Sequence, residues 1–439
     1  MKKPAMVSEW IKQHIYFIFA VSLAFILVSP TEIWDIMYGQ FNFVQLVFTV
    51  IALILLITVI TLLFALPFSG ESAKRRLFFR GWLRERMWLM FYIAAIFIAI
   101  VTSADPMLSL SYLPISLCGP FLVYIIDSGK FTYKKLIRIL CFAALGLLIS
   151  SVVAFIQRIG GIEVNKSFTN LTVNPNMPGR VDSVFGNPNV YGFVLASVLP
   201  LTAAYALGSK NRLRWVIGGV SFLAGIAALI MTYSRGAWLA FAVAALIFVA
   251  LYKPKLIPVI LLLGAAAIPF IPGTIKDRLL TIFNPADTSI SYRGTLMGSA
   301  VKLIADNLLL GAGLGMNTVR PIIHALYWPT DLDPIYQFYH AHNILLQLWC
   351  EMGAVGVITF FGMLIQGIVR ALRGLRSMSK QGRLFTSLLV AGVAAMLLCG
   401  ITDAPLTTPR TMMLFWILFG LMGTVRKAEE HINPSITFR

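Results

Sequence analysis

The sequence predicts an all-α polytopic membrane protein with about twelve transmembrane helices and a helical loop domain on the outer side. Of its 439 residues, 58% are hydrophobic and only 12% are charged. The mean hydropathy of +0.82 is far above that of a water-soluble domain of this length. Apolar stretches of membrane-spanning length recur along the chain, and basic residues gather on alternate connecting segments.

Each predicted span is an apolar stretch long enough, or nearly so, to cross a hydrocarbon core about 30 Å thick. The spans are 14–29, 43–68, 87–104, 108–127, 136–157, 189–207, 215–233, 236–252, 256–271, 343–369, 384–402 and 409–425. The ninth is short and contains Pro258 and Pro269, which interrupt helices. We therefore expect residues 1–271 to hold nine spans and an outer loop at 158–188. A large outer loop at 272–342 follows, and 343–439 supplies three more spans and an inner tail.

The distribution of basic residues predicts the orientation. Most of the 36 Lys and Arg residues lie on the segments that connect the spans on one side. The positive-inside rule places those segments, and both termini, in the cytoplasm. The net charge of +18 therefore indicates membrane orientation rather than nucleic-acid binding. The cations left on the outer side, Arg180, Arg235 and Arg293 among them, run against this bias and need another explanation.

The large outer loop contains a helical pattern. Within Ser291 to Leu308, the residues Leu296, Ala300 and Leu303 recur at helical spacing. This pattern predicts an amphipathic helix lying at the outer membrane surface. The stretch Gly311 to Gly315 is rich in glycine, but no strand precedes it, which favours a flexible turn over a dinucleotide-binding loop.

The three outer arginines are candidate anion ligands. Guanidinium stays charged and presents a planar fork of donors that suits phosphate oxygens. Arg235 lies in a very short turn between two predicted spans, Arg293 follows Tyr292 in the large loop, and Arg180 precedes the sixth span. The alternative is that each pairs with lipid headgroups or with a loop carboxylate.

Histidines mark the point where the large loop re-enters a hydrophobic span. His342 is the strongest candidate for chemistry, because imidazole titrates near neutral pH, and His340 and Asn343 flank it. A purely structural role is the alternative. Histidines two residues apart do not share a helix face, and no cluster around them has metal-ligand spacing, so no metal site is predicted.

Other polar residues have weaker signals. Tyr339 could stack on a sugar ring or belong to the aromatic belt at the membrane boundary. Asp403 is one of the few acidic residues on the predicted outer side. Glu351 lies inside the tenth span, where an ionisable side chain is costly and is expected to have a partner.

Three motifs resemble those of the bacterial O-antigen ligase family, a superfamily that also includes O-antigen polymerases and protein O-oligosaccharyltransferases. His342-Asn343, nine residues, and then Gly353-Ala354-Val355-Gly356 resemble one motif. Thr232-Tyr233-Ser234-Arg235-Gly236 resembles the family's Ser-Arg turn, and Tyr292-Arg293 before Gly311 to Gly315 resembles its second arginine and glycine-rich stretch. The resemblance covers roughly residues 180 to 425. This sequence differs from the family pattern at Thr295 to Met297, where the family often has an aromatic residue a few positions after the second arginine.

The resemblance implies a membrane glycosyltransferase of the GT-C-like type that needs no metal and no cofactor. It implies transfer of a glycan from undecaprenyl diphosphate to a lipid A-core acceptor on the periplasmic face of the bacterial inner membrane. In that family pattern Arg235 and Arg293 bind the diphosphate and His342 acts on the acceptor. Arg180, His340, Asn343 and Tyr339 are further candidates from their positions in this sequence.

Two alternatives stay open. An O-antigen polymerase would elongate the carrier-linked glycan with the same loop and arginines. A solute transporter is the alternative from a different class. A transporter is expected to place ionisable residues near the bilayer midplane and to show repeat symmetry, whereas here the polar chemistry gathers at one face.

Overall fold

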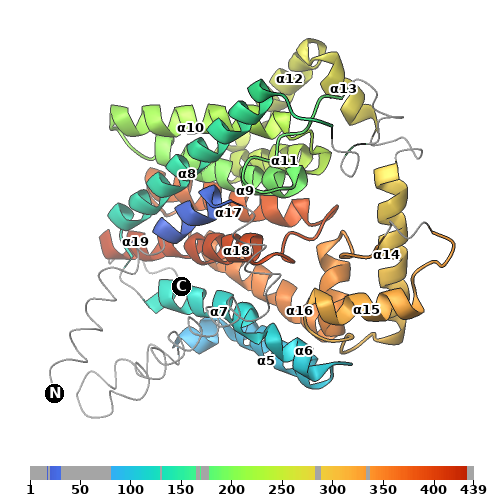
Figure 1. Cartoon of the computed structure of the whole chain (residues 1–439). Coiled ribbons are helices and arrows are strands. Elements are labelled where there is room, and N and C mark those ends of the chain that lie inside the picture. Colours follow the sequence, from blue (N-terminus) through green and yellow to red (C-terminus); the bar gives the residue numbers. More distant parts are fainter. Residues whose placement is uncertain are drawn as a thin grey trace.

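The computed structural model describes residues 17, 20–30, 81–128, 131–164, 169, 177–281, 288–332 and 337–432. Within these ranges all regular secondary structure is helical. Most of the long helices run side by side in Figure 1, and α14 (Thr288–Asp306) crosses one end of the bundle. The predicted span 43–68 lies outside the described residues, and of the span 14–29 the structure describes a helical stretch at 20–28.

The remaining elements follow in chain order: α5 (Met87–Val101), α6 (Pro106–Ser111), α7 (Leu113–Ser128), α8 (Tyr133–Gly160), α9 (Pro188–Leu207), α10 (Arg212–Met231), α11 (Arg235–Tyr252), η1 (Pro254–Leu256), α12 (Ile257–Ala267), η2 (Ile268–Phe270), α13 (Gly273–Leu280), α15 (Met316–Leu326), α16 (Ile344–Leu372), α17 (Lys380–Cys399), α18 (Pro409–Met422) and α19 (Thr424–Ile432). Eight helices in the described residues are long and apolar enough to cross a membrane. The fold class predicted from the sequence, an all-α polytopic membrane protein, is therefore confirmed.

Two predicted spans differ in detail. The stretch 87–104 forms α5, a 15-residue helix that is shorter than the others. The stretch 256–271 is broken, because η1, α12 and η2 follow one another and the chain then bends by 112° into α13. If this bent pair counts as one span, the described residues hold nine. Pro258 and Pro269 lie in this broken region, where proline removes backbone donors.

The centre of the bundle is formed by α9, α17 and α18. About four fifths of the apolar window of each is buried, against 28% for α10 and α11. The start of α9 is fixed by Asn187, whose side chain accepts hydrogen bonds from two backbone N–H groups, followed by Pro188 in the first turn. We call the end of the bundle that carries the loops 177–187 and 400–408 the outer end, as the sequence predicts, and the opposite end the inner end.

The helices of the large loop pack on the protein. The predicted stripe of Leu296, Ala300 and Leu303 lies on α14 and is buried in a small second core with α15 and with Cys350 of α16. The predicted helix is present, but its apolar stripe packs on protein and not on lipid. Periodicity reveals an apolar face, but the same face can cover lipid or protein.

The glycine-rich stretch is held in place by a break in α16. Gly353 has φ 62 and ψ −166, which interrupts the helix and frees backbone groups on either side. Ala312 N–H donates to the carbonyl of Cys350, and Ala354 N–H donates to the carbonyl of Leu308. A Cβ at Gly353 would lie 2.3 Å from the Leu309 backbone. Gly311 to Gly315 is therefore a fixed backbone contact rather than a flexible turn.

Candidate functional site

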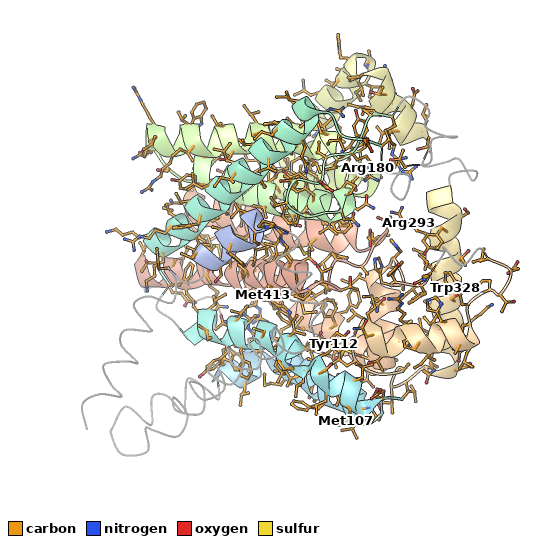
Figure 2. The ribbon with its side chains drawn as sticks, in the orientation of Figure 1. Met107, Tyr112, Arg180, Arg293, Trp328 and Met413 are labelled. Carbon is orange, nitrogen blue, oxygen red and sulfur yellow. The ribbon has the colours of Figure 1, made fainter. Side chains whose placement is uncertain are left out.

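Four arginines converge at the outer end. Arg180 precedes α9, Arg235 opens α11, Arg278 lies on α13 and Arg293 on α14. Arg180, Arg235 and Arg278 are at most 9% exposed, and Arg293 is half-buried. Figure 2 labels Arg180 and Arg293, both at the end of the molecule where α14 stands. Arg278 is absent from the residues predicted from the sequence, although it is an outer cation like the others.

Short contacts to neutral oxygens orient these side chains. Arg180 donates from Nε to the carbonyl of Thr232 over 2.7 Å and from NH2 to Oδ1 of Asn189 over 2.5 Å. Arg235 donates to Oγ1 of Thr281 over 2.6 Å. Arg278 donates to the carbonyl of Tyr233. Two arginines from other segments, Arg180 and Arg278, therefore donate hydrogen bonds to the turn between α10 and α11.

The arginines repel one another. Burial and, in decreasing order of effect, the nearby Arg278, Arg293 and Arg235 together lower the pKa of Arg180 to about 9. This pKa still leaves Arg180 charged near neutral pH. Because like charges held together destabilise one another, an anion placed among them would relieve the repulsion. The cluster can thus hold a group with several negative oxygens, such as a diphosphate.

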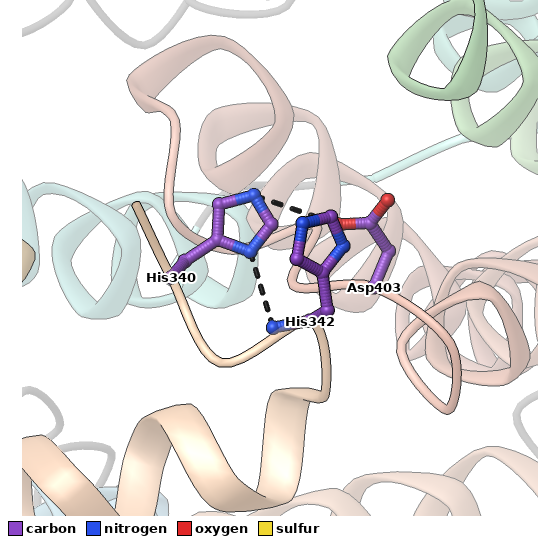
Figure 3. Close-up of side chains that lie close together, drawn as sticks. All are labelled: His340, His342 and Asp403. Atoms are coloured by element: carbon purple, nitrogen blue, oxygen red, sulfur yellow. Dashed lines mark hydrogen bonds and ion pairs between the residues drawn. The ribbon is translucent and has the colours of Figure 1, made fainter. Parts of the chain in front are cut away.

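A second cluster joins His340, His342 and Asp403 (Figure 3). His342 Nδ1 lies 3.3 Å and His340 Nε2 3.7 Å from the same Oδ1 of Asp403. These are ion-pair distances, and His342 Nδ1 makes no aligned hydrogen bond within the described residues. The backbone N–H of His342 donates to Nδ1 of His340 over 3.2 Å, which leaves the Nε2 of His340 to carry its proton toward Asp403.

Electrostatics set the charges in this cluster. Burial lowers the pKa of His340 to about 4 despite the opposing effect of Asp403, so His340 is neutral near pH 7. Burial raises the pKa of Asp403, but His342, His340 and Arg293 outweigh it and hold this pKa well below the usual range. Asp403 is therefore an ionised carboxylate. Because Arg293 influences both Arg180 and Asp403, it connects the arginine cluster to the histidine cluster.

Close packing brings the arginine turn beside Asp403. A Cβ built at Gly236 would lie 2.5 Å from Oγ1 of Thr402, the residue before Asp403. Only glycine therefore allows the start of α11 to approach the loop between α17 and α18 this closely.

Backbone strain is concentrated at the same end. In the part of the chain that the structure describes, Ser183, Tyr233 and His342 are the non-glycine residues with positive φ, at 53°, 50° and 47°. Such conformations cost on the order of 1–3 kcal/mol each and cluster at functional sites.

A hydrogen-bonded network holds the histidine loop. Asn343 caps α16 by accepting from Leu346 N–H, and its Nδ2 donates to the carbonyl of Ile401. Gln347 Oε1 accepts from the backbone N–H of Ala341, between the two histidines, and Gln347 Nε2 donates to Glu351 over 2.6 Å. Glu351 also accepts from Gly315 N–H. The intramembrane Glu351 thus has the partner that the sequence leads us to expect, and Asn343 supports the loop.

Another residue predicted from the sequence, Tyr339, lies farther out. Tyr339 is 51% exposed, and the Arg320 guanidinium stacks on its ring at 4.8 Å. A cavity of about 50 Å³ behind the histidine loop is lined by Gln347, Glu351 and Ala404. This volume holds a few waters but no sugar.

The cluster also meets a spacing requirement for metal ions. The ligand atoms of His340, His342 and Asp403 all lie within 4.8 Å of one another. The sequence does not reveal this group, because Asp403 comes from a loop that lies 61 residues after His342. The signal that could have pointed to Asp403 is its position in a short turn between two predicted spans, which is also the position of Arg235. The positive charge of Arg293 close by opposes a cation there.

The fold and the site define a polytopic α-helical membrane protein whose outer end gathers arginines around a histidine–aspartate pair. Residues 220–361 match the protein family described as O-antigen ligase. The matched segment is about a third of the chain and includes Arg235, Arg293 and His342, and it supports a relation to membrane glycosyltransferases of the ligase or polymerase type. No curated protein matches the chain.

Proposed function

We propose that the protein is an O-antigen ligase. It transfers a glycan from undecaprenyl diphosphate to a sugar of a lipid A-core acceptor on the periplasmic face of the bacterial inner membrane. The observation that carries this proposal is the convergence of Arg180, Arg235, Arg278 and Arg293, of which Arg293 also acts electrostatically on His340 and Asp403. Both termini are cytoplasmic in this proposal, and the substrates enter from the membrane.

The reaction needs one bond to form and one to break. The acceptor hydroxyl oxygen attacks the anomeric carbon while the bond from that carbon to the diphosphate oxygen breaks. The proton of the hydroxyl passes to His342, and the diphosphate leaves with the bonding electron pair. The arginines stabilise the negative charge that develops on the leaving group, and the base contributes about 10²- to 10⁴-fold to the rate.

Asp403 orients the base. Its carboxylate, 3.3 Å from Nδ1, favours the tautomer of His342 with the proton on Nδ1 and leaves Nε2 to accept the proton of the acceptor. The same carboxylate stabilises the imidazolium after proton transfer. His340 is neutral and fixes the backbone of His342 through Nδ1. In this proposal the arginines supply the charge that a divalent ion would otherwise supply, so neither metal nor cofactor is required.

Reconstitution with defined substrates tests the proposal. The purified protein is placed in liposomes with a carrier-linked glycan and either lipid A-core or a second carrier-linked glycan. Product on lipid A-core supports the ligase. Product only on the second carrier-linked glycan identifies a polymerase and overturns the proposed acceptor. Absence of either product from correctly folded protein contradicts glycan transfer itself.

The variant Asp403→Asn tests the role of Asp403. The amide keeps the size of the side chain but removes the negative charge. We expect transfer to fall at least about tenfold through kcat, since the imidazolium loses its counter-charge. An unchanged kcat would remove Asp403 from the mechanism.

A further inference from the structure

A second charged cluster lies at the inner end, about 40 Å along α16 from the histidines if its 29 residues each rise 1.5 Å. Its centre is Asp127 at the end of α7, whose side chain is fully buried. Arg86 donates to Asp127 over 2.8 Å, Arg370 donates over 3.1 Å, and Lys427 Nζ lies 3.3 Å away. The ends of α7, α16 and α19 and the segment before α5 therefore meet at one carboxylate.

Among the described residues of this cluster, positive charges outnumber negative charges. Two further carboxylates stand at its rim, where Glu85 pairs with Arg370 and Glu430 pairs with Arg426. The described cations Arg86, Arg370, Arg426 and Lys427 thus face the carboxylates Asp127, Glu85 and Glu430. Because both rim carboxylates are more than 40% exposed, water screens them more than it screens the inner cations.

Buried donors in the cluster lack acceptors. Arg86 NH2 and Arg370 Nε are buried and, like the acceptor Oδ1 of Asp127, have no hydrogen-bond partner among the described residues. A buried charged donor without an acceptor costs free energy comparable to a lost charge-assisted hydrogen bond. Arg86 NH2 lies directly behind Gly423, 3.3 Å from the position that a Cβ would take there.

A cavity opens beside these donors. It has a volume of about 240 Å³ and is lined by Trp82, Gly423, Arg370, Arg426 and Lys427, with Glu85 and Glu430 at the rim. One water needs only roughly 10–15 Å³ of such space, so the cavity admits a larger group. The sequence places this end at the cytoplasmic leaflet, where basic pockets between transmembrane helices bind the headgroups of anionic lipids.

We propose that this inner cavity binds a phosphate-bearing anion. Its phosphate oxygens accept from the guanidinium of Arg370, from Arg426 and from Lys427 at the membrane boundary. The source is either the phosphodiester of an anionic phospholipid or free phosphate. The site lies at the opposite end of the bundle from the proposed transfer chemistry and does not depend on it.

The test measures binding to the purified full-length protein in a zwitterionic detergent. Dihexanoyl phosphatidylglycerol, the matching phosphatidylcholine and inorganic phosphate are added separately, and the shift in melting temperature is recorded against concentration. We expect phosphatidylglycerol to raise the melting temperature with saturation and phosphatidylcholine to have no effect. A saturating shift with inorganic phosphate alone also supports the site and assigns free phosphate as its ligand.

Matched variants decide whether the cavity is responsible. Arg426→Gln with Lys427→Gln removes two cations that line it, and we expect at least tenfold weaker binding. Arg373→Gln with Arg376→Gln removes two exposed cations that follow α16 at the same end of the bundle, and we expect it to leave binding unchanged. Equal weakening in both pairs would show general surface attraction and overturn the proposal, as would the absence of any saturating shift.

A third variant is expected to strengthen binding, so misfolding cannot explain its effect. Glu430→Gln removes a rim carboxylate that competes for Arg426, so we expect binding to tighten about two- to fivefold, on the order of a surface ion pair. Weaker binding in this variant would contradict a phosphate site at Arg426.

Discussion

The two ends of the bundle gather cations in different ways. At the inner end, Arg86, Arg370 and Lys427 surround one buried carboxylate. At the outer end, the described contacts of Arg180, Arg235 and Arg278 are to backbone carbonyls, a hydroxyl and an amide. Ion pairs hold the inner helices together, whereas the contacts described for these outer arginines are hydrogen bonds to neutral oxygens. The same residue type thus serves two purposes, and the outer cluster is the one that our proposal assigns to the diphosphate of the donor.

Replacing the base should have the largest effect on transfer. We expect His342→Ala to lower kcat by at least about 100-fold, because proton transfer by a positioned base contributes 10²- to 10⁴-fold. The measurement is the initial rate of glycan transfer in liposomes. His324→Gln is the control, since glutamine retains an acceptor for the Phe338 N–H. Wild-type activity in His342→Ala would remove this residue from the mechanism.

Removing the arginine that connects the two outer clusters should act mainly on the donor. Arg293→Ala loses a charge-assisted contact worth about 1.5–3 kcal/mol, which corresponds to an increase of about 10- to 100-fold in the KM for the carrier-linked glycan. Arg293→Lys should lie between, because lysine keeps the charge but not the planar fork.

Lys302→Ala, an exposed cation on the same helix, serves as the control for Arg293. An equal effect of Lys302→Ala would mean that charge on α14, rather than a site, attracts the donor. None of these α14 variants should alter phosphate binding at the inner cavity. A loss of phosphate binding in any of them would contradict the independence of the two sites.

The network behind the histidine loop should have a smaller effect. Gln347→Met leaves the buried Ala341 N–H without an acceptor, at a cost of about 1–3 kcal/mol, and lets the loop shift. We expect a lower melting temperature and about a tenfold lower kcat with little change in KM.

Gln366→Met is the matched control for Gln347, because Gln366 lies in the inner half of α16 and accepts from Trp88 N–H. It should lower the melting temperature without lowering kcat per folded molecule. If both variants lose kcat equally, Gln347 has only a general role in stability.

Removal of divalent ions should have the smallest effect. If the outer arginines stabilise the leaving group, dialysis against a chelator leaves the transfer rate unchanged. The measurement compares rates before and after chelation and after adding Mn²⁺ or Zn²⁺. Loss of activity on chelation, restored by one ion, would instead make His340, His342 and Asp403 a metal centre.

The sequence by itself determined the class of the protein, because hydropathy and charge bias depend on local composition. It also marked Arg235, Arg293 and His342 as candidates, since a polar residue in an apolar chain stands out without any knowledge of contacts. The apolar stripe of α14 was equally visible at Leu296, Ala300 and Leu303. Periodicity could not decide whether that stripe meets lipid or protein.

Only the tertiary structure decided which groups meet. Asp403 faces His342 because Ile344 N–H donates to the Gly400 carbonyl and Asn343 donates to Ile401, contacts between segments far apart in the chain. Arg278 reaches the turn at Tyr233 because the chain bends by 112° before α13. Local patterns set each helix, but the spacing of charges depends on how helices distant in sequence pack, and no local pattern records that packing.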